Sequence, residues 1–233
     1  MKGLTFGICT DWSDPHRVHT MIASIRALDI PTYEIIVSGA WKSELDLLRG
    51  EKVDLYCYNE GWLPKKKNQI AKLAKFDTIV LAHDYYIFDK DWYNAYEEFG
   101  YKWDVCSNPQ YLMNGRRHFT DWVLWDHPTL PRYTSLDYHD ESNTKYQYLS
   151  GGYFLVKRHI LNQYPMNERL EPGSAEDLEW FLPIRDKVKL RCNPNAKVIH
   201  NKEHRDMRRT GFPFVQESHT YAYVRDGKVE VAF

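Results

Sequence analysis

The stretch FDTIVLAHDYYIF, from Phe76 to Phe88, decides the fold and marks a candidate site. Four apolar residues, Ile79 to Ala82, lead directly into His83 and Asp84, after which aromatic and aliphatic side chains return. A short apolar run of this kind is typical of a buried strand. Two interpretations of its polar end are open. Either Asp84 closes a turn by hydrogen bonding to the backbone, or it binds a ligand.

Elements on the amino-terminal side of this stretch alternate between strand and helix patterns. The apolar run from Leu4 to Cys9 predicts a strand, and apolar side chains at helical spacing between residues 15 and 28 predict the helix after it. Strand patterns also lie at Glu34 to Gly39, Val53 to Tyr58 and Thr78 to Ala82, and a helix pattern lies at Lys66 to Phe76. This alternation predicts an α/β fold with a mainly parallel sheet and helices on both faces.

The second half of the chain is less regular. Tyr111 to Tyr148 is a long stretch rich in Trp, Tyr, His and Pro, and a loop region of that length inside a compact domain is usually functional. Two alternating runs around Asp226 and Gly227 predict a carboxyl-terminal β-hairpin. Elsewhere, helix patterns lie at 89–99 and 175–186, and strand patterns lie at 151–158 and 196–200. Because no repeat or linker interrupts the chain, we expect one domain.

The charge balance and the cysteines limit the classes of partner. With 31 Lys and Arg against 32 Asp and Glu, the formal net charge is -1, which argues against a nucleic-acid or membrane-surface binder. No apolar run approaches the roughly 18 residues of a membrane span, and the amino-terminal segment lacks the layout of a signal peptide. The cysteines form no CxxC pair, so we expect reduced core thiols and a cytoplasmic location; they are Cys9, Cys57, Cys106 and Cys192.

Polar residues gather at the predicted strand ends, where ligands bind in open parallel sheets. Asp84 and His200 form a candidate pair for Mn²⁺ or Mg²⁺, since a carboxylate and an imidazole completed by substrate oxygens suit such a cation. For His200 the alternative is a buried histidine with an ordinary hydrogen-bonding role. The other strand-end residues that we expect to contact a ligand in the same crevice are Thr10, Asp11, Ser38 and His83.

Three further motifs have both a structural and a functional interpretation. Glu176 and Asp177 lie in the first turn of a helix after Ser174, which is a typical N-cap, yet one of these acids could act as a general base. Gly151 and Gly152 precede a strand, where they either form a tight turn or let the backbone approach a ligand.

Basic residues near the predicted site form the third motif. Lys67 and Asn68 open a helix that could meet a diphosphate, whereas Lys65 and Lys66 are more typical of a solvated charge run. A basic tail could fold over phosphates as a lid, or could be a solvated loop; its charged residues are Lys202, Arg205, Arg208 and Arg209.

The order of these motifs resembles the GT-A fold of nucleotide-sugar glycosyltransferases, family-two-like, between Leu4 and Asn201. The resemblance implies that Asp84 is the last acid of the DxD-type motif that holds a divalent metal on the donor diphosphate. Ala82 stands where the first acid is usual, so coordination rests on Asp84 with His200, or His83 compensates. A second departure is the end of strand two, where family members often have an acid that contacts the nucleoside and this chain has Ser38 and Gly39.

The resemblance also assigns roles to the second half of the chain. Asp177 matches the base that deprotonates the acceptor, with Glu176 as the adjacent alternative, and Gly151 and Gly152 match the segment that lines the donor sugar. Trp122 and Trp125 are candidate sugar-stacking platforms. The expected domain, 1–233, then comprises a nucleotide-binding half (1–110), an acceptor and catalytic half (111–200), and a tail with a hairpin (201–233).

The function that follows is a metal-dependent, inverting glycosyltransferase that moves a sugar from a nucleoside-diphosphate sugar to a hydroxyl of a carbohydrate acceptor. A nucleotidyltransferase of similar architecture is one alternative, although residues 7–17 match its glycine-rich phosphate loop poorly. A carbohydrate- or nucleotide-binding module without activity is the other. The residues expected to bind the donor are Thr10, Asp11, Ser38, Lys67, Asn68, His83, Gly151, Gly152 and Lys202.

Overall fold

The central sheet has seven strands in the order β11-β6-β10-β4-β1-β2-β3, in a computed structural model that describes residues 3–40, 53–202, 221–225 and 228–232. Every neighbouring pair is parallel except the two made by β10, which runs antiparallel to β4 and β6. The strands are β1 (Leu4–Cys9), β2 (Tyr33–Gly39), β3 (Leu55–Tyr58), β4 (Thr78–His83), β6 (Val105–Ser107), β10 (Tyr153–Lys157) and β11 (Leu190–Cys192). The predicted mainly parallel α/β fold is confirmed.

Register aligns the carboxyl ends of the central strands. Cys9, the last residue of β1, lies opposite Ser38 of β2 on one side and His83 of β4 on the other. The residues that follow, Thr10 and Asp84, therefore leave the sheet side by side. Because of this alignment, the polar residues that end these strands form one group, the Asp84 cluster.

Alternation along the strands explains why both faces of the sheet are buried. Side chains at Leu4, Phe6 and Ile8 contribute to one apolar cluster, whereas those at Ile79 and Leu81 contribute to a second cluster on the other face. Successive side chains of a strand point to opposite faces, so continuous apolar runs require cover on both sides. Each fully buried Ile, Leu or Phe side chain contributes roughly 1.5–3 kcal/mol to stability.

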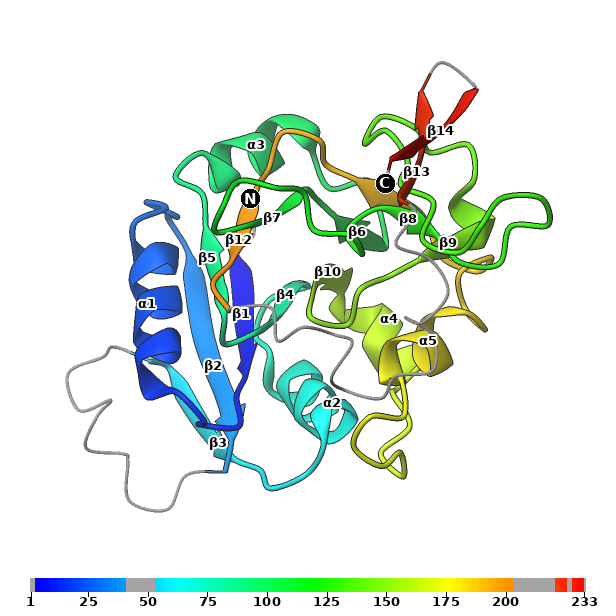
Figure 1. Cartoon of the computed structure of the whole chain (residues 1–233). Coiled ribbons are helices and arrows are strands. Elements are labelled where there is room, and N and C mark those ends of the chain that lie inside the picture. The colour runs from blue at the N-terminus through cyan, green and yellow to red at the C-terminus, as the bar shows by residue number, and fades with distance from the viewer. Residues whose placement is uncertain (1–2, 41–52, 203–220, 226–227, 233) are drawn as a thin grey trace.

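Helices supply that cover. Asp14 caps α1 by accepting a hydrogen bond from the His16 backbone N–H, and Pro15 occupies the first turn, where its missing N–H is not needed. Figure 1 shows α1 and α2 on opposite sides of β1 and β2. The helices are α1 (Pro15–Arg26), α2 (Leu63–Leu73), α3 (Trp92–Phe99), α4 (Arg158–Gln163) and α5 (Glu176–Phe181). Among the described residues, no helix is long and apolar enough to cross a membrane.

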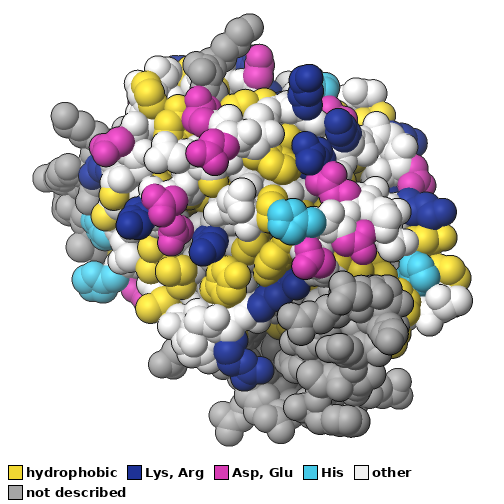
Figure 2. All heavy atoms as spheres, turned by 90° about the horizontal axis from the view of Figure 1, so that it is seen from above, with side chains coloured by type: hydrophobic (Ala, Val, Ile, Leu, Met, Phe, Trp, Pro, Cys, Tyr) yellow, Lys and Arg dark blue, Asp and Glu magenta, His cyan; other side chains and the backbone are white. Residues whose placement is uncertain are grey.

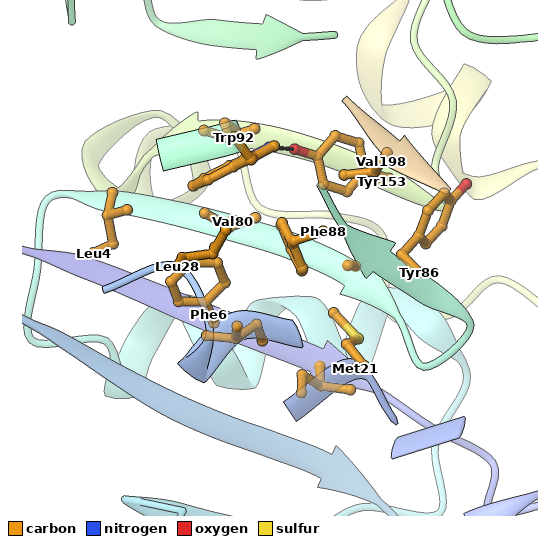
Figure 3. Close-up of a cluster of buried hydrophobic side chains, with 14 of the residues drawn as sticks. Leu4, Phe6, Met21, Leu28, Val80, Tyr86, Phe88, Trp92, Tyr153 and Val198 are labelled. Atoms are coloured by element: carbon orange, nitrogen blue, oxygen red, sulfur yellow. Dashed lines mark hydrogen bonds between the residues drawn. The ribbon is translucent and has the colours of Figure 1, made fainter. Parts of the chain in front are cut away.

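A small second sheet covers the carboxyl side of β4. Its order is β5-β12-β7, with β5 (Tyr86–Phe88), β12 (Val198–His200) and β7 (Gln110–Leu112). His200 lies opposite Tyr86 in this sheet, which brings the end of β12 to the segment that follows Asp84. Figure 3 shows the cluster beneath it, where the Trp92 indole N–H donates to the Tyr153 hydroxyl at 2.8 Å.

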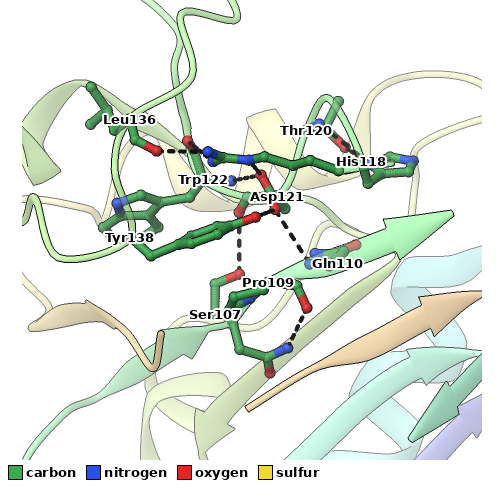
Figure 4. Close-up of polar contacts among 11 residues, drawn as sticks. Ser107, Pro109, Gln110, His118, Thr120, Asp121, Trp122, Leu136 and Tyr138 are labelled. Carbon is green, nitrogen blue, oxygen red and sulfur yellow. Dashed lines mark hydrogen bonds and ion pairs between the residues drawn. The ribbon is translucent and has the colours of Figure 1, made fainter. Parts of the chain in front are cut away.

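The irregular stretch is organised around one buried carboxylate. Asp121 is 1% exposed and accepts hydrogen bonds from Arg117 Nε at 2.8 Å and from the Tyr138 hydroxyl at 2.5 Å (Figure 4). Arg117 also stacks over the Tyr138 ring at 4.1 Å and donates to two backbone carbonyls. A buried charge that is paired and fully hydrogen bonded holds a long loop in place without a regular sheet. The short elements here are β8 (Val123–Leu124), β9 (Gln147–Tyr148) and a 3-10 turn (Thr144–Tyr146).

Several element predictions are confirmed and several boundaries are corrected. The carboxyl-terminal hairpin is present as β13 (Tyr221–Arg225) paired with β14 (Lys228–Ala232), although its turn at 226–227 lies outside the described residues. The four cysteines are buried and none forms a disulfide, as expected. Helix α2 begins earlier than predicted because Pro64 suits its first turn. Among the described residues, the sequence patterns missed the short elements β5, β7, β8, β9, α4 and β11.

Figure 2 shows the distribution of charge on one face of the molecule. On the face shown in Figure 2, the described Lys and Arg side chains are interspersed with Asp and Glu, and neither sign forms a large patch. This mixture matches the formal net charge of -1.

Candidate functional site

Asp84 lies directly after β4, where its carboxylate is held from the side of β1. The Thr10 hydroxyl donates to Asp84 Oδ2 at 2.5 Å, and the same oxygen of Thr10 accepts the Trp12 backbone N–H at 2.9 Å. The residue is only 6% exposed. The pKa of Asp84 is raised to about 6, chiefly by burial; the hydrogen bond from Thr10 opposes the rise, and the negative charge of Asp11 adds to it. The site therefore holds a buried carboxylate that, among the described residues, has no ion pair.

The two lysines that open α2 are buried rather than solvated, so the expectation of a solvated charge run was wrong for Lys66. Its ammonium donates to the Thr10 carbonyl at 2.7 Å, and burial lowers its pKa. Lys67 is 1% exposed, donates to the Gly151 carbonyl at 2.8 Å and pairs with Glu176 Oε1 at 3.2 Å. Lys66 thus lies beside the Asp84 cluster, whereas Lys67 connects α2 to the glycine pair and to α5.

Two of the predicted donor-binding residues have structural partners instead. Asn68 exchanges hydrogen bonds with the backbone of Met166, at 2.8 Å and 2.9 Å, and donates to Glu168 at 2.9 Å. Ser38 is buried and donates to Gln69 at 2.8 Å. Asn68 therefore anchors α2 to the 166–168 loop, and Ser38 anchors α2 to β2. The structure does not bring Asn68 into the Asp84 cluster.

The glycine pair joins the end of β4 to the start of α5. Gly152 accepts the His83 backbone N–H at 2.9 Å, and Gly151 donates its N–H to Asp177 Oδ2 at 3.0 Å. A Cβ atom at Gly151 would lie 2.8 Å from Asp177 Cβ, and one at Gly152 would lie 3.2 Å from the Tyr85 hydroxyl. Glycine is needed here because side chains of the protein itself approach the backbone closely.

Asp177 is oriented by three donors. Its Oδ2 accepts the Tyr148 hydroxyl and the Gly151 N–H, and its Oδ1 accepts the Leu178 N–H at 2.9 Å. The predicted N-cap, Ser174, was wrong: the cap position is Ala175, which has φ +48° and makes no side-chain cap bond. A non-glycine residue in the left-handed region costs about 1 kcal/mol or more, and such residues cluster at functional sites.

Two other residues with positive φ also flank the cluster. Trp12 has φ +59° and directly follows Thr10 and Asp11. Tyr133 has φ +61°, and burial together with the negative charge of Asp177 raises its pKa. Asp11 itself is exposed. Partial burial would raise the pKa of Asp11, but hydrogen bonds from Ser13 and the positive charges of nearby lysines hold it below its usual range.

His83 and Tyr85 form a hydrogen-bonded pair between Asp84 and the second sheet. His83 Nδ1 lies 2.7 Å from the Tyr85 hydroxyl, and His83 Nε2 is buried without a hydrogen-bond partner in the described part of the chain. Burial, together with nearby positive charges led by Lys67, holds the pKa of His83 well below its usual value. The imidazole is therefore neutral. Burial also raises the pKa of Tyr85, so its hydroxyl is neutral as well, and the tautomer of His83 sets which of the two groups donates.

His200 packs in an aromatic stack. Its ring lies 4.5 Å from Tyr85 on one side and 5.1 Å from His118 on the other, and Lys202 places its ammonium 5.1 Å over the Tyr85 ring. His118 is 6% exposed and was missed because it lies in the irregular stretch, where periodicity gives no signal. Tyr85 and Tyr148 were also missed; only the position of Tyr85 next to Asp84 could have indicated it. Arg205, Arg208 and Arg209, the rest of the predicted lid, lie outside the described residues.

The donor set at this site fits a cation only with help from a ligand. Within the described ranges, no group of three His, Cys, Asp or Glu side chains is placed to hold a metal ion. Mg²⁺ is, however, commonly bound through one or two carboxylates and completed by substrate phosphates and water. A buried Asp84 with a raised pKa and a second carboxylate, Asp11, nearby has the excess negative charge that a cation would offset.

The two tryptophans of the irregular stretch differ. Trp122 is 1% exposed and donates to the Asp140 carbonyl at 3.0 Å, so the prediction that it stacks on a sugar was wrong. Trp125 lies beside the tyrosine that orients Asp177, with its ring centre 5.9 Å from that of Tyr148 and 4.8 Å from the Arg132 guanidinium. Trp125 is therefore the residue of this pair that borders the cluster.

Comparison with solved structures identifies the fold. The chain is similar to S. aureus TarS 1-349 in complex with UDP-GlcNAc, with a TM-score of 0.59, 17% identity, and coverage of 98% of this chain and 60% of that one. A longer S. aureus TarS structure matches with a TM-score of 0.58 and 15% identity over 87% of this chain and 37% of that one. This chain thus spans at most 60% of the length of these TarS chains.

The same comparison includes S. aureus TarS 1-349 in complex with UDP, which matches with a TM-score of 0.55 and 17% identity over 87% of this chain and 59% of that one. No family model matches the sequence, and no curated protein does either. At these identities the likeness shows the fold alone. The GT-A-like architecture expected from the motif order is confirmed.

Proposed function

We propose that this chain is a nucleotide-sugar glycosyltransferase that acts on a hydroxyl of a carbohydrate acceptor. One observation carries the proposal. A buried carboxylate at the end of β4, Asp84, and an oriented carboxylate at the start of α5, Asp177, flank the same glycine pair. The GT-A-like fold supports it, as do the structural neighbours, the TarS structures, which include complexes with UDP-GlcNAc and with UDP.

The donor would lie beyond the carboxyl ends of β1 and β4 with its diphosphate near Asp84. Lys66 is held at the Thr10 carbonyl and Lys202 lies over Tyr85, so both supply positive charge near this point. Asp84 and His200 would hold Mn²⁺ or Mg²⁺ together with the diphosphate oxygens, and the cation would supply Lewis-acid neutralisation of the leaving group. With its proton on Nε2, the neutral His83 would donate a hydrogen bond to an oxygen of the sugar donor.

Asp177 would act as the general base. Its Oδ2 already accepts two hydrogen bonds, from the Tyr148 hydroxyl and the Gly151 N–H, whereas Oδ1 accepts only the Leu178 N–H, so Oδ1 is the oxygen that would take a proton from the acceptor. As the acceptor oxygen bonds to the anomeric carbon, its proton passes to Asp177 and the bond to the diphosphate oxygen breaks with its electron pair. Attack from the face opposite the diphosphate inverts the anomeric centre. A positioned base contributes roughly 10²- to 10⁴-fold to the rate.

Transfer or hydrolysis of a panel of nucleoside-diphosphate sugars in the presence of Mn²⁺ tests this function. Asp177→Asn is expected to abolish turnover while donor binding persists. Glu179→Gln is the matched control, because Glu179 belongs to the same helix but contacts Asn167 on the outside of the protein. An α-configured product from an α-configured donor would overturn inversion.

A binding module without activity is the second candidate, and one observation favours it. Ala82, which stands in place of the first acid of the metal motif, is buried in the sheet and contributes no ligand. Release of free sugar and nucleoside diphosphate by the wild-type protein, lost in Asp177→Asn, would exclude this candidate. Donor binding without release of either product would favour it.

A further inference from the structure

A cleft lies at the opposite end of the main sheet from Asp84. It has a volume of about 620 Å³ and opens where β4, β6 and β11 begin and where the antiparallel β10 ends. These four strands are neighbours in the sheet, so the cleft runs across their adjoining ends. Its lining includes Tyr101, Lys102, Trp103, Lys157 and Lys189.

One lysine in this cleft is held in place by aromatic rings. The Lys157 ammonium lies 4.2 Å from the Trp103 ring centre and 5.1 Å from that of Tyr101, and donates to the Thr78 hydroxyl at 2.9 Å. The rings are themselves fixed, because the Trp103 indole N–H donates to the Gly100 carbonyl at 2.9 Å. Cation–π contacts of this kind stabilise an ammonium group without neutralising its charge.

Positive charge exceeds negative charge in the cleft. Asp77 pairs with Arg158 at 3.2 Å, and Asp104 accepts the Lys189 backbone N–H at 2.8 Å. Of the described residues, none forms an ion pair with the ammonium groups of the three lysines in the cleft, which are Lys102, Lys157 and Lys189.

The walls are rigid because the backbone ties neighbouring strands together. Lys157 donates its N–H to the Asp104 carbonyl at 2.8 Å, Asp104 donates to the Lys189 carbonyl at 2.9 Å, and Arg158 donates to the Asp77 carbonyl at 2.8 Å. The charged side chains therefore start from fixed positions, which lowers the entropic cost of gathering them around a ligand.

We propose that this cleft binds a phosphorylated saccharide at a site separate from the candidate catalytic cluster. Three lysines suit a phosphate group, and a volume of this size exceeds that of a lone phosphate and falls in the roughly 300–1,000 Å³ range of small-molecule sites. The carboxylates of Asp77 and Asp104, which line the cleft, supply acceptors for sugar hydroxyls. The ligand could be a free sugar phosphate or a phosphate-bearing unit of a longer glycan.

Calorimetric titration at low ionic strength tests the proposal with three probes: glucose 6-phosphate, inorganic phosphate and glucose. Glucose 6-phosphate is expected to bind the wild-type protein at least about tenfold more tightly than the other two, since only it combines charge with hydroxyls. Binding is expected to persist in saturating UDP. Phosphorylated dextran tests whether the ligand is a polymer. A higher affinity per phosphate than that of glucose 6-phosphate would identify a phosphate-bearing glycan as the ligand.

Variants locate the binding. Lys157→Met is expected to weaken glucose 6-phosphate binding about tenfold or more, because it keeps the aliphatic stem on Trp103 and removes the charge. Lys145→Met is the matched control, since Lys145 lies over the Tyr146 ring at 4.9 Å outside the cleft. If Lys157→Met does not fold, the exposed pair Lys102→Gln and Lys189→Gln replaces it. No binding to the wild type, equal binding to these variants, or displacement by UDP would overturn the proposal.

Discussion

Replacing Asp84 by Asn is expected to stabilise the fold at neutral pH while removing metal-dependent donor binding. The structure supplies the reason. Asp84 is 6% exposed, and burial raises its pKa from 3.8 to about 6. Asn keeps an oxygen that can accept the Thr10 hydroxyl, which now lies 2.5 Å from Asp84 Oδ2, but it carries no charge to desolvate.

The magnitude and its sign follow from proton linkage. Because the pKa of Asp84 is about 2 units higher in the folded than in the unfolded state, protonated Asp84 contributes about 3 kcal/mol to the free energy of unfolding relative to the ionised form. This contribution is lost as the pH rises through the folded pKa. Ionised Asp84 therefore costs about 3 kcal/mol at pH 8, about half of that at pH 5, and nothing well below the unfolded pKa. Burying the new amide N–H₂ group offsets about 1 kcal/mol of the gain. The net stabilisation is about 2 kcal/mol at pH 8, or roughly 4–8 °C in Tm for a chain of this size.

Thermal unfolding in EDTA at pH 8 and pH 5 measures this difference. The Tm advantage of Asp84→Asn is expected to shrink as the pH falls, and added Mn²⁺ with a nucleoside diphosphate is expected to raise the Tm of the wild type alone. Asp186→Asn, at an exposed position, is the control for removing one negative charge. A variant that is no more stable than the wild type at pH 8, or whose advantage does not change with pH, would refute the reasoning.

Three other substitutions test the contacts around the glycine pair. Gly151→Ala places a Cβ 2.8 Å from Asp177 Cβ, so chemical denaturation should show a loss of about 1–3 kcal/mol. Tyr148→Phe removes one donor that orients Asp177 and should lower kcat with little change in KM; an unchanged kcat would contradict this. Lys67→Met leaves Glu176 buried without its cation, so urea unfolding should show a loss of about 3–5 kcal/mol, and Glu176→Gln in the same chain should recover part of it.

The sequence predicts much of the fold because strand and helix periodicities are local. The apolar run that ends at His83 identifies β4, and its polar end identifies one wall of the site. Short elements were not predicted because three residues, as in β5 or β11, are too few to show a period. The antiparallel direction of β10 escaped too, since an apolar run of strand length is compatible with either direction.

The partners of buried polar groups were decided by tertiary structure alone. Lys66, Lys67 and Asn68 are adjacent in sequence, yet their side chains reach the Thr10 carbonyl, Glu176 and the Met166 backbone, respectively. Helical geometry turns successive side chains by about 100°, so neighbours in sequence face different partners. Which partner each one meets depends on strands and loops far along the chain.

By itself the sequence determined that polar residues end the central strands and that carboxylates open a late helix. It did not determine that Asp84 and Asp177 flank one glycine pair, that Trp122 is a core residue, or that Tyr85 joins His83 to His200. The reason is physical. Periodicity records which side of an element is buried, whereas a site consists of contacts between elements, and those contacts form only when the sheet register aligns the strand ends.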